Sequence, residues 1–296
     1  MPVLSLIRVV SISSVALIAM QLPDETTFKS VVFSVGFGHY FMALLYSKRQ
    51  ISQVLGQTYS YLPLAAVLIA GTALYQYEYP LVIYFAVHHA FNEVYVLDHP
   101  IAGKNSSELK GFRASGIFLH LFVYFLILRD RPDLQFLDTR FLLIGLAVSS
   151  LSFIYFLNSI RGSMKISEMI DHCSFELIGL FLATVSFFIE ITFMQIIFYH
   201  FMFWILYPMP RVLKRGRSEL LRYFILTLVI TVPFIMVSPL GIYSYDLYTS
   251  PFFAHFMMWS YLHITISFAL SEAHPSWITY WFKPRRAIPS AALKPM

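Results

Sequence analysis

The sequence is built from apolar segments that are each about as long as a membrane is thick. A helix that crosses about 30 Å of hydrocarbon needs about 20 mostly apolar residues. Segments of this kind occupy residues 8–22, 28–46, 57–76, 80–97, 113–129, 140–160, 173–189, 191–208, 220–240 and 252–272. We therefore expect an all-α fold, a polytopic integral membrane helical bundle with about ten transmembrane helices. Residues 1–296 would form a single membrane domain, because the connections are too short for a second one.

The charged residues support this interpretation. Only 12% of the chain is charged, whereas a soluble domain has roughly 25%. The basic residues gather on alternate connections, at Lys48/Arg49, Lys104/Lys110/Arg113, Arg161/Lys165, Arg211/Lys214/Arg215/Arg217 and Lys283/Arg285/Arg286. By the positive-inside rule, both termini are expected to be cytoplasmic. Membrane orientation explains the net charge of +5 better than nucleic acid binding does, so no nucleic acid partner is expected.

Two apolar segments can be interpreted in more than one way, and the expected number of helices depends on both. The apolar run 173–207 would overhang the bilayer by roughly 20 Å as one upright helix, so we expect a break at residues 186–190. The first apolar stretch follows Arg8 and lacks a convincing small-x-small cleavage site before Pro23, so we interpret it as a membrane helix rather than a signal peptide. The single cysteine, Cys173, excludes an internal disulfide and a multi-cysteine metal site.

Polar residues inside the segment 81–97 point to a functional site. This segment contains His88, His89, Asn92 and Glu93. Ionisable side chains at bilayer depth cost about 2.5–3.5 kcal/mol each, so they usually face the protein interior and serve a function.

Three other segments carry a histidine at a similar position: His39, His200 and His263. Counted from the expected outer end of each helix, these and His88 fall within a layer about 5 Å thick. A single intramembrane histidine more often makes a hydrogen bond between helices. Four at matched depth favour a shared metal ion, for which neutral imidazole is a common ligand.

Other ionisable residues are assigned lesser roles. Glu93, a little more than one turn from His88, is expected to assist catalysis by orienting an imidazole, with a polar lining residue as the alternative. His89 points about 100° away from His88, so both are not expected to face one centre equally. We expect His120 to make a structural hydrogen bond and His255 to lie near the outer end of its helix.

Several motifs resemble those of a known family. They are FELIGLFLATVSFFIEITFMQIIFYH at residues 175–200, HHAFNE around His88, GHYFMALLY around His39 and LHITISFALSEAHPSW around His263. In these motifs the chain resembles the Brp/Blh family of integral-membrane β-carotene 15,15'-dioxygenases. The resemblance covers most of the chain as an order of helices. Trp204 departs from it, because family members have a histidine there.

The resemblance implies a specific chemistry. It implies Fe(II) held by His39, His88, His200 and His263, with Glu93 assisting. O2 and a hydrophobic, lipid-soluble substrate would be the reactants, and a carotenoid or similar polyene would be cleaved oxidatively, as in the formation of retinal. We expect the protein among the lipids of the inner (cytoplasmic) membrane of a bacterium.

Two alternatives stay open. One is a di-iron lipid hydroxylase or desaturase, which usually has more histidines in HxxxH and HxxHH patterns, hinted at here only by His88 and His89. The other is a non-enzymatic transporter or haem-binding membrane subunit. A transporter would tend to have helices broken at mid-depth. Pro63 and Pro233 are the only prolines well inside the expected helices.

Overall fold

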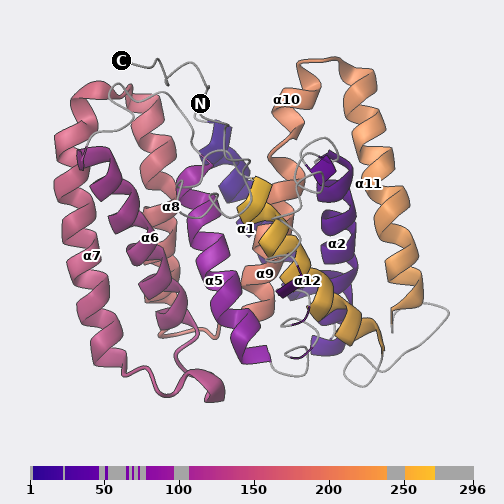
Figure 1. Cartoon of the computed structure of the whole chain (residues 1–296), viewed down its shortest axis with the longest axis horizontal. Helices are drawn as coiled ribbons and strands as arrows, with labels where there is room; N and C mark the ends of the chain where they lie inside the picture. Colours follow the sequence, from indigo (N-terminus) through magenta and orange to yellow (C-terminus); the bar gives the residue numbers. More distant parts are fainter. Residues whose placement is uncertain are drawn as a thin grey trace, which may run out of the picture.

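The computed structural model describes residues 3–22, 24–46, 78–96, 107–238 and 251–270, together with positions 51, 52, 65, 66, 69 and 73. Within these residues the regular elements are all helices, which confirms the all-α prediction (Figure 1). The α-helices are α1 (Val3–Gln21), α2 (Glu25–Tyr46), α5 (Glu78–Tyr95), α6 (Ser107–Ile127), α7 (Thr139–Ile160), α8 (Ile166–Val185), α9 (Phe193–Leu206), α10 (Met209–Leu213), α11 (Arg217–Val237) and α12 (Pro251–Leu270). Two short 3-10 helices cover Pro132–Leu134 and Arg161–Ser163.

Six helical spans of the described residues are long and apolar enough to cross a membrane. They are Val3–Gln21, Glu25–Leu45, Ser107–Ile127, Thr139–Ile160, Phe193–Leu213 and Arg217–Val237. The expected segments 80–97, 173–189 and 252–272 form α5, α8 and α12, which are not among these six. Most of the expected segment 57–76 lies outside the described residues. The membrane-type bundle is therefore supported, whereas the count of ten stays a prediction.

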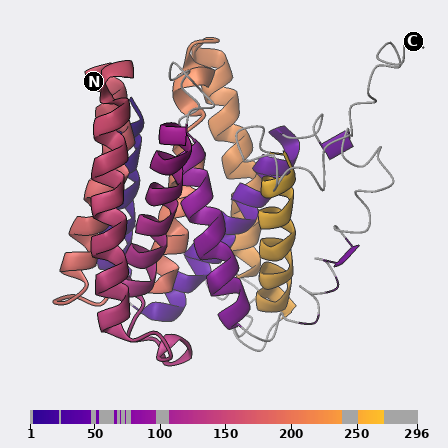
Figure 2. The ribbon, with the colours of Figure 1, turned by 60° about the vertical axis from the view of Figure 1, so that its left-hand side comes forward.

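The helices form a bundle with the site helices near its middle. Helices α6 and α7 pack together on one side, and α2 and α11 pack together on the other. Helices α1, α5 and α9 lie between these two pairs, and α12 contacts both α2 and α5 (Figures 1 and 2). This arrangement brings α2, α5, α9 and α12, which carry the histidines of interest, to one place.

The outer helices present apolar side chains to the surroundings. On α7, exposed apolar residues recur at helical spacing, at Phe141, Ile144, Val148, Leu151 and Tyr155. Large apolar residues on one stripe of a helix are buried in a soluble fold, but here they face outward. Helix α7 lies at the edge of the bundle (Figure 1), so its outward stripe is suited to contact membrane lipids.

The long apolar run is broken where its length predicts. Helix α8 ends at Val185 and α9 begins at Phe193, which confirms the expected break near residues 186–190. Thr192 caps α9 through a hydrogen bond that its side chain accepts from the Gln195 backbone N–H, and the Gln195 side chain accepts one from the Thr192 backbone. Arg129 donates to the carbonyl and the hydroxyl of Ser186, at 2.9 and 3.0 Å, and so satisfies the end of α8.

Two glycines let α2 approach its neighbours closely. A Cβ atom on Gly36 would lie 2.6 Å from the Phe201 ring of α9 and 2.7 Å from the Phe256 ring of α12. A Cβ atom on Gly38 would collide with the Thr231 side chain of α11. Small residues at helix contacts permit this close packing in membranes. The next residue along α2 is His39, so the glycines set how deeply that imidazole enters the bundle.

Candidate metal centre

Three of the four predicted ligands have ring nitrogens that lie close to one another. His39, His200 and His263, from α2, α9 and α12, each offer one ring nitrogen within 4.8 Å of the other two. The Nε2 atoms of His39 and His263 are 3.2 Å apart. Two nitrogens that each bind one first-row metal ion at about 2.1 Å are separated by roughly 3.0–3.4 Å, depending on the angle. The geometry of this pair therefore fits a shared ion.

His88, the fourth predicted ligand, packs against the same group. Its ring centroid lies 5.1 Å from that of His200 and 5.8 Å from that of His263. Its Nε2 atom is 3.0 Å from the amide nitrogen of Asn92, one turn further along α5. The four imidazoles expected to meet are thus side by side, although His88 is not in the group of three with matched donor distances.

His89 also belongs to the cluster, which the sequence interpretation did not expect. Its Nδ1 atom lies 3.3 Å from Nδ1 of His200, and the two ring centroids are 5.5 Å apart. Neighbouring helix positions differ by about 100°, so His88 and His89 do not face one point, but the His200 ring reaches both. The angle between His88 and His89 follows from α5 alone, whereas the contact of His89 depends on the His200 ring of the facing helix α9.

The cluster lies inside the bundle. His39, His88, His89 and His200 are buried, with at most 7% of each residue exposed, and His263 is partly exposed. Nitrogen donors from neutral imidazoles in an apolar setting suit Fe(II), Cu or Zn, and the single cysteine of the chain lies elsewhere, on α8. The donor set is therefore compatible with the non-haem iron expected from the sequence.

Glu93 lies beside the cluster but is held by other partners. Its Oε2 atom accepts hydrogen bonds from Arg8 Nε at 3.2 Å and from an Arg8 terminal nitrogen at 3.0 Å. Its Oε1 atom accepts a hydrogen bond from the Tyr199 hydroxyl at 3.2 Å. The expected direct hydrogen bond from Glu93 to an imidazole is not among these contacts. Glu93 instead reaches the histidines through Tyr199, whose ring packs edge-on against His89.

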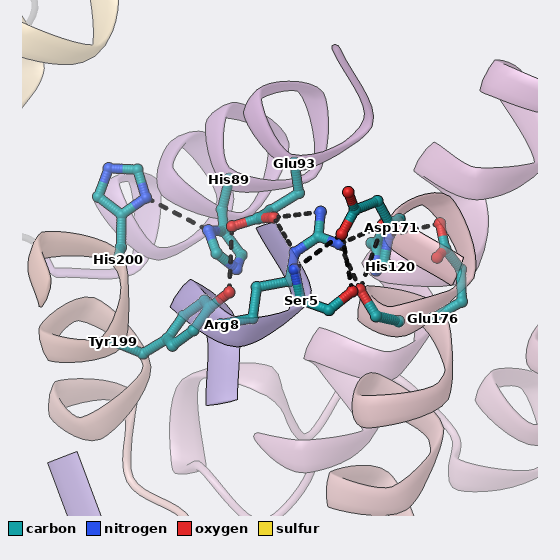
Figure 3. Close-up of polar contacts among 10 residues, drawn as sticks. Ser5, Arg8, His89, Glu93, His120, Asp171, Glu176, Tyr199 and His200 are labelled. Atoms are coloured by element: carbon teal, nitrogen blue, oxygen red, sulfur yellow. Dashed lines mark hydrogen bonds and ion pairs between the residues drawn. The ribbon is translucent and has the colours of Figure 1, made fainter. Parts of the chain in front are cut away.

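Arg8 is the functional residue that the sequence interpretation missed. It was read as a charge flanking the first membrane helix, but α1 begins at Val3, so Arg8 lies inside the helix and is 1% exposed. Besides Glu93, its guanidinium donates to the Asp171 carbonyl at 2.6 Å and to the Ser174 hydroxyl at 2.7 Å (Figure 3). The apolar residues before Arg8 in VLSLIR were the available signal that the helix starts earlier.

His120 and His255 lie at the expected places along their helices. His120 on α6 lies 3.4 Å from a carboxylate oxygen of Glu176 on α8, and its ring centroid is 4.1 Å from that of Phe175. This pair lies beyond the Arg8 network from His200 (Figure 3). His255 is exposed near the start of α12. The Nε2 atom of His120 makes no hydrogen bond within the described residues, so the expected hydrogen bond is replaced by this contact with the Glu176 carboxylate.

Two sizeable cavities border the histidines, besides a space of about 10 Å³ lined by residues that include His88, His200 and His263. The larger one, of about 490 Å³, is lined by residues that include His39, His200, His263, Trp204, Tyr207 and Arg211. The smaller one, of about 280 Å³, is lined by His89, His120 and Tyr199 among mostly apolar residues. The larger volume falls in the range of small-molecule sites in proteins, and His39, His200 and His263 all belong to its wall.

No protein-family model, curated protein or solved structure matches this chain. The resemblance to the carotenoid dioxygenases therefore stays a prediction, and the functional argument depends on the geometry of the histidine cluster and its cavity.

Proposed function

We propose that this protein is an integral-membrane non-haem iron oxygenase that uses O2 to cleave a carotenoid or a similar polyene. The observation that carries the proposal is the group of ring nitrogens from His39, His200 and His263, which lie within 4.8 Å of one another beside a cavity. A hydrogen bond between helices would explain two neighbouring histidines. It would not explain why three helices each place an imidazole in the same group.

These residues have distinct roles in the proposal. His39, His200 and His263 would hold the iron, and His88, whose Nε2 atom now lies 3.0 Å from the Asn92 amide nitrogen, would be the fourth ligand. Iron(II) bound by these neutral nitrogen ligands would supply the activation of O2. The protein's own contribution is to fix these rings through helix packing and the Gly36 contact, and to keep bulk water away from them.

The cavity explains how a hydrophobic substrate would be positioned. Its wall combines the histidines with apolar and aromatic side chains such as Met42, Trp259 and Leu262. These side chains offer contact surface to a polyene and leave the ring nitrogens as the main polar groups at that end. A substrate dissolved in the bilayer would enter without crossing water, and aromatic walls would orient its conjugated bonds.

Expression in a β-carotene-producing bacterium tests the proposal. Wild type should bleach the cells and yield retinal, whereas His88→Ala and His200→Ala should not. His255→Ala, an exposed histidine of the same helix as His263, is the matched control and should bleach as wild type does. If cells that express the wild type normally keep their colour, β-carotene is not the substrate. If the purified protein contains no iron, the protein is not an iron oxygenase.

A di-iron lipid hydroxylase or desaturase is the second candidate, favoured by one observation. His88 and His89 both contact His200, so the cluster contains five imidazoles rather than four. Metal analysis distinguishes the two, because a di-iron enzyme binds twice as much iron per chain as a mononuclear one. The absorption spectrum of the same sample tests a haem-binding subunit, which would show a Soret band.

A further inference from the structure

One face of the α9–α10 span carries polar and aromatic residues from the histidines to the end of the bundle. His200, Trp204, Tyr207 and Arg211 are spaced by four, three and four residues, so they share one helix face. The apolar span Phe193–Leu213 contains all four. All four also line the 490 Å³ cavity. We call these four residues the α9 stripe.

The α9 stripe carries hydrogen-bond donors at two places, next to His200 and at its far end. Arg211 donates to the Tyr207 hydroxyl at 3.1 Å, and its guanidinium carbon lies 5.1 Å from the centre of that ring. The Trp204 indole N–H is buried and has no hydrogen-bond partner in the part of the chain that the structure describes. Indole and guanidinium groups donate and do not accept. A ligand that brings an acceptor to this wall of the cavity would therefore meet donors that the neighbouring side chains do not fully use.

The charge of Arg211 indicates that the acceptor group of the ligand is an anion. A guanidinium binds carboxylate or phosphate oxygens in preference to neutral ones, often through two parallel hydrogen bonds. Tyr207 holds the guanidinium at the cavity wall, and the Trp204 and Tyr207 rings pack 5.2 Å apart between Arg211 and His200. The arrangement suits a ligand with an acidic head at Arg211 and an apolar body along the stripe.

The spacing of the stripe sets the length of that body. Arg211 lies eleven positions after His200, which corresponds to about 16 Å along a helix. An extended residue spans up to about 3.6 Å over three backbone bonds, so an extended ligand chain advances about 1.2 Å per bond. About thirteen bonds would therefore separate the acidic group from the atoms that lie at the histidines.

We propose that the cavity binds a long-chain acid, with its carboxylate on Arg211 and its unsaturated chain reaching His39, His200 and His263. The inference rests on the proposed function for its chemical meaning, since it adds polyenes with an acid at one end to the substrates that the oxygenase accepts. Binding of the acid does not depend on catalysis and is measured separately.

Fluorescence of cis-parinaric acid, a polyene fatty acid, provides the test. The purified full chain in phosphatidylcholine nanodiscs is titrated with the acid and, in parallel, with its methyl ester. Arg211→Gln should weaken binding of the acid by at least about tenfold, because it removes a charge-assisted hydrogen bond, and should leave the ester unchanged. Trp204→Phe should weaken the acid by a smaller factor.

Arg215→Gln is the matched control. Arg215 belongs to the same basic connection and is exposed, but it does not line the cavity. If Arg211 only orients the protein in the membrane, both variants will bind the acid as wild type does, and the proposal is overturned. Equal weakening by Arg211→Gln and Arg215→Gln would also overturn it, since that result indicates a general attraction of anions to the basic surface.

Iron content and carotene bleaching, measured on the same variants, separate the two proposals. Arg211→Gln should retain the wild-type iron content, because Arg211 is about 16 Å along the helix from His200. Arg211-dependent binding of the acid to a protein without iron would support the lipid-acid site and reject the oxygenase. Iron binding, together with binding of the acid that does not depend on Arg211, would support the oxygenase and reject the lipid-acid site.

Discussion

Arg8 of α1 and Glu93 of α5 form an ion pair at 3.0 Å in which each side chain is only 1% exposed. The pair links two helices through residues that are 85 positions apart in the sequence. The Tyr199 hydroxyl donates to Glu93 and so connects the pair to the histidine cluster. Burying one of these charges alone is costly in a low dielectric. Each residue therefore requires the other, and together they fix α1 against the helix that carries His88 and His89.

Removal of one partner is expected to destabilise the protein strongly. Arg8→Met leaves Glu93 buried without its cation and should cost about 3–5 kcal/mol, which lowers the unfolding temperature in detergent. The double variant Arg8→Met/Glu93→Gln should recover part of the loss, because no unpaired charge remains. Glu25→Gln, which removes the more exposed pair with Lys29, should change stability by less than about 1 kcal/mol. A double variant less stable than Arg8→Met would contradict this account.

Single histidine variants are expected to separate ligands from bystanders. His39→Ala, His200→Ala and His263→Ala should each lower the iron bound per chain, since each removes one of the grouped nitrogens. His255→Ala should retain it. Elemental analysis of the purified variants gives the result. Full iron content in the His200→Ala variant would count against the ligand assignment.

The close approach of α2 to α11 makes Gly38 sensitive to any side chain. Gly38→Ala places a methyl group against Thr231 and should cost about 1–3 kcal/mol through overpacking. Thr231→Ala in the same chain should restore part of the stability, because the Thr231 hydroxyl oxygen is the nearest atom. Gly162→Ala, with nothing within 4 Å of the new methyl group, is the matched control. Thermal unfolding of the three variants measures the effect, and an unchanged Gly38→Ala protein would show that α2 can shift freely.

Asp24, in the connection between α1 and α2, gives the stability a pH dependence. The backbone N–H and the hydroxyl of Thr27 donate to its carboxylate and hold the pKa of Asp24 below the usual 3.8. A lowered pKa means that the charged form stabilises the folded state, so this contribution is present above the unfolded pKa. It is lost as the pH falls from about 5 to about 2. Over that range the unfolding temperature should fall more for wild type than for Asp24→Asn, and parallel curves would exclude this role.

The residues that could be predicted are those whose signal is local. His39, His88, His200 and His263 each interrupt an apolar segment, and the cost of a polar group in lipid indicates that such residues face the interior. The break between α8 and α9 followed from length alone, because one helix cannot overhang the bilayer by several turns.

The residues that could not be predicted depend on contacts between distant segments. The partnership of Arg8 with Glu93 is invisible in either segment, since each looks like an isolated charge until the helices are packed. The same holds for His89, whose place in the cluster depends on how far the His200 ring extends from α9. Helix boundaries add a further error, because starting α1 five residues too late moved Arg8 from the interior to the flank.

The cap at Thr192 also determines where this chain tolerates a change of length. Helix α9 starts from that hydrogen-bonded residue, and every residue beyond it turns the helix by about 100°. Deleting one residue between the cap and His200 would rotate the imidazole away from His39 and His263, whereas an added residue at 187–190 would leave its angular phase unchanged. An insertion at 187–190 should therefore be tolerated, whereas a deletion between Thr192 and His200 should inactivate the protein.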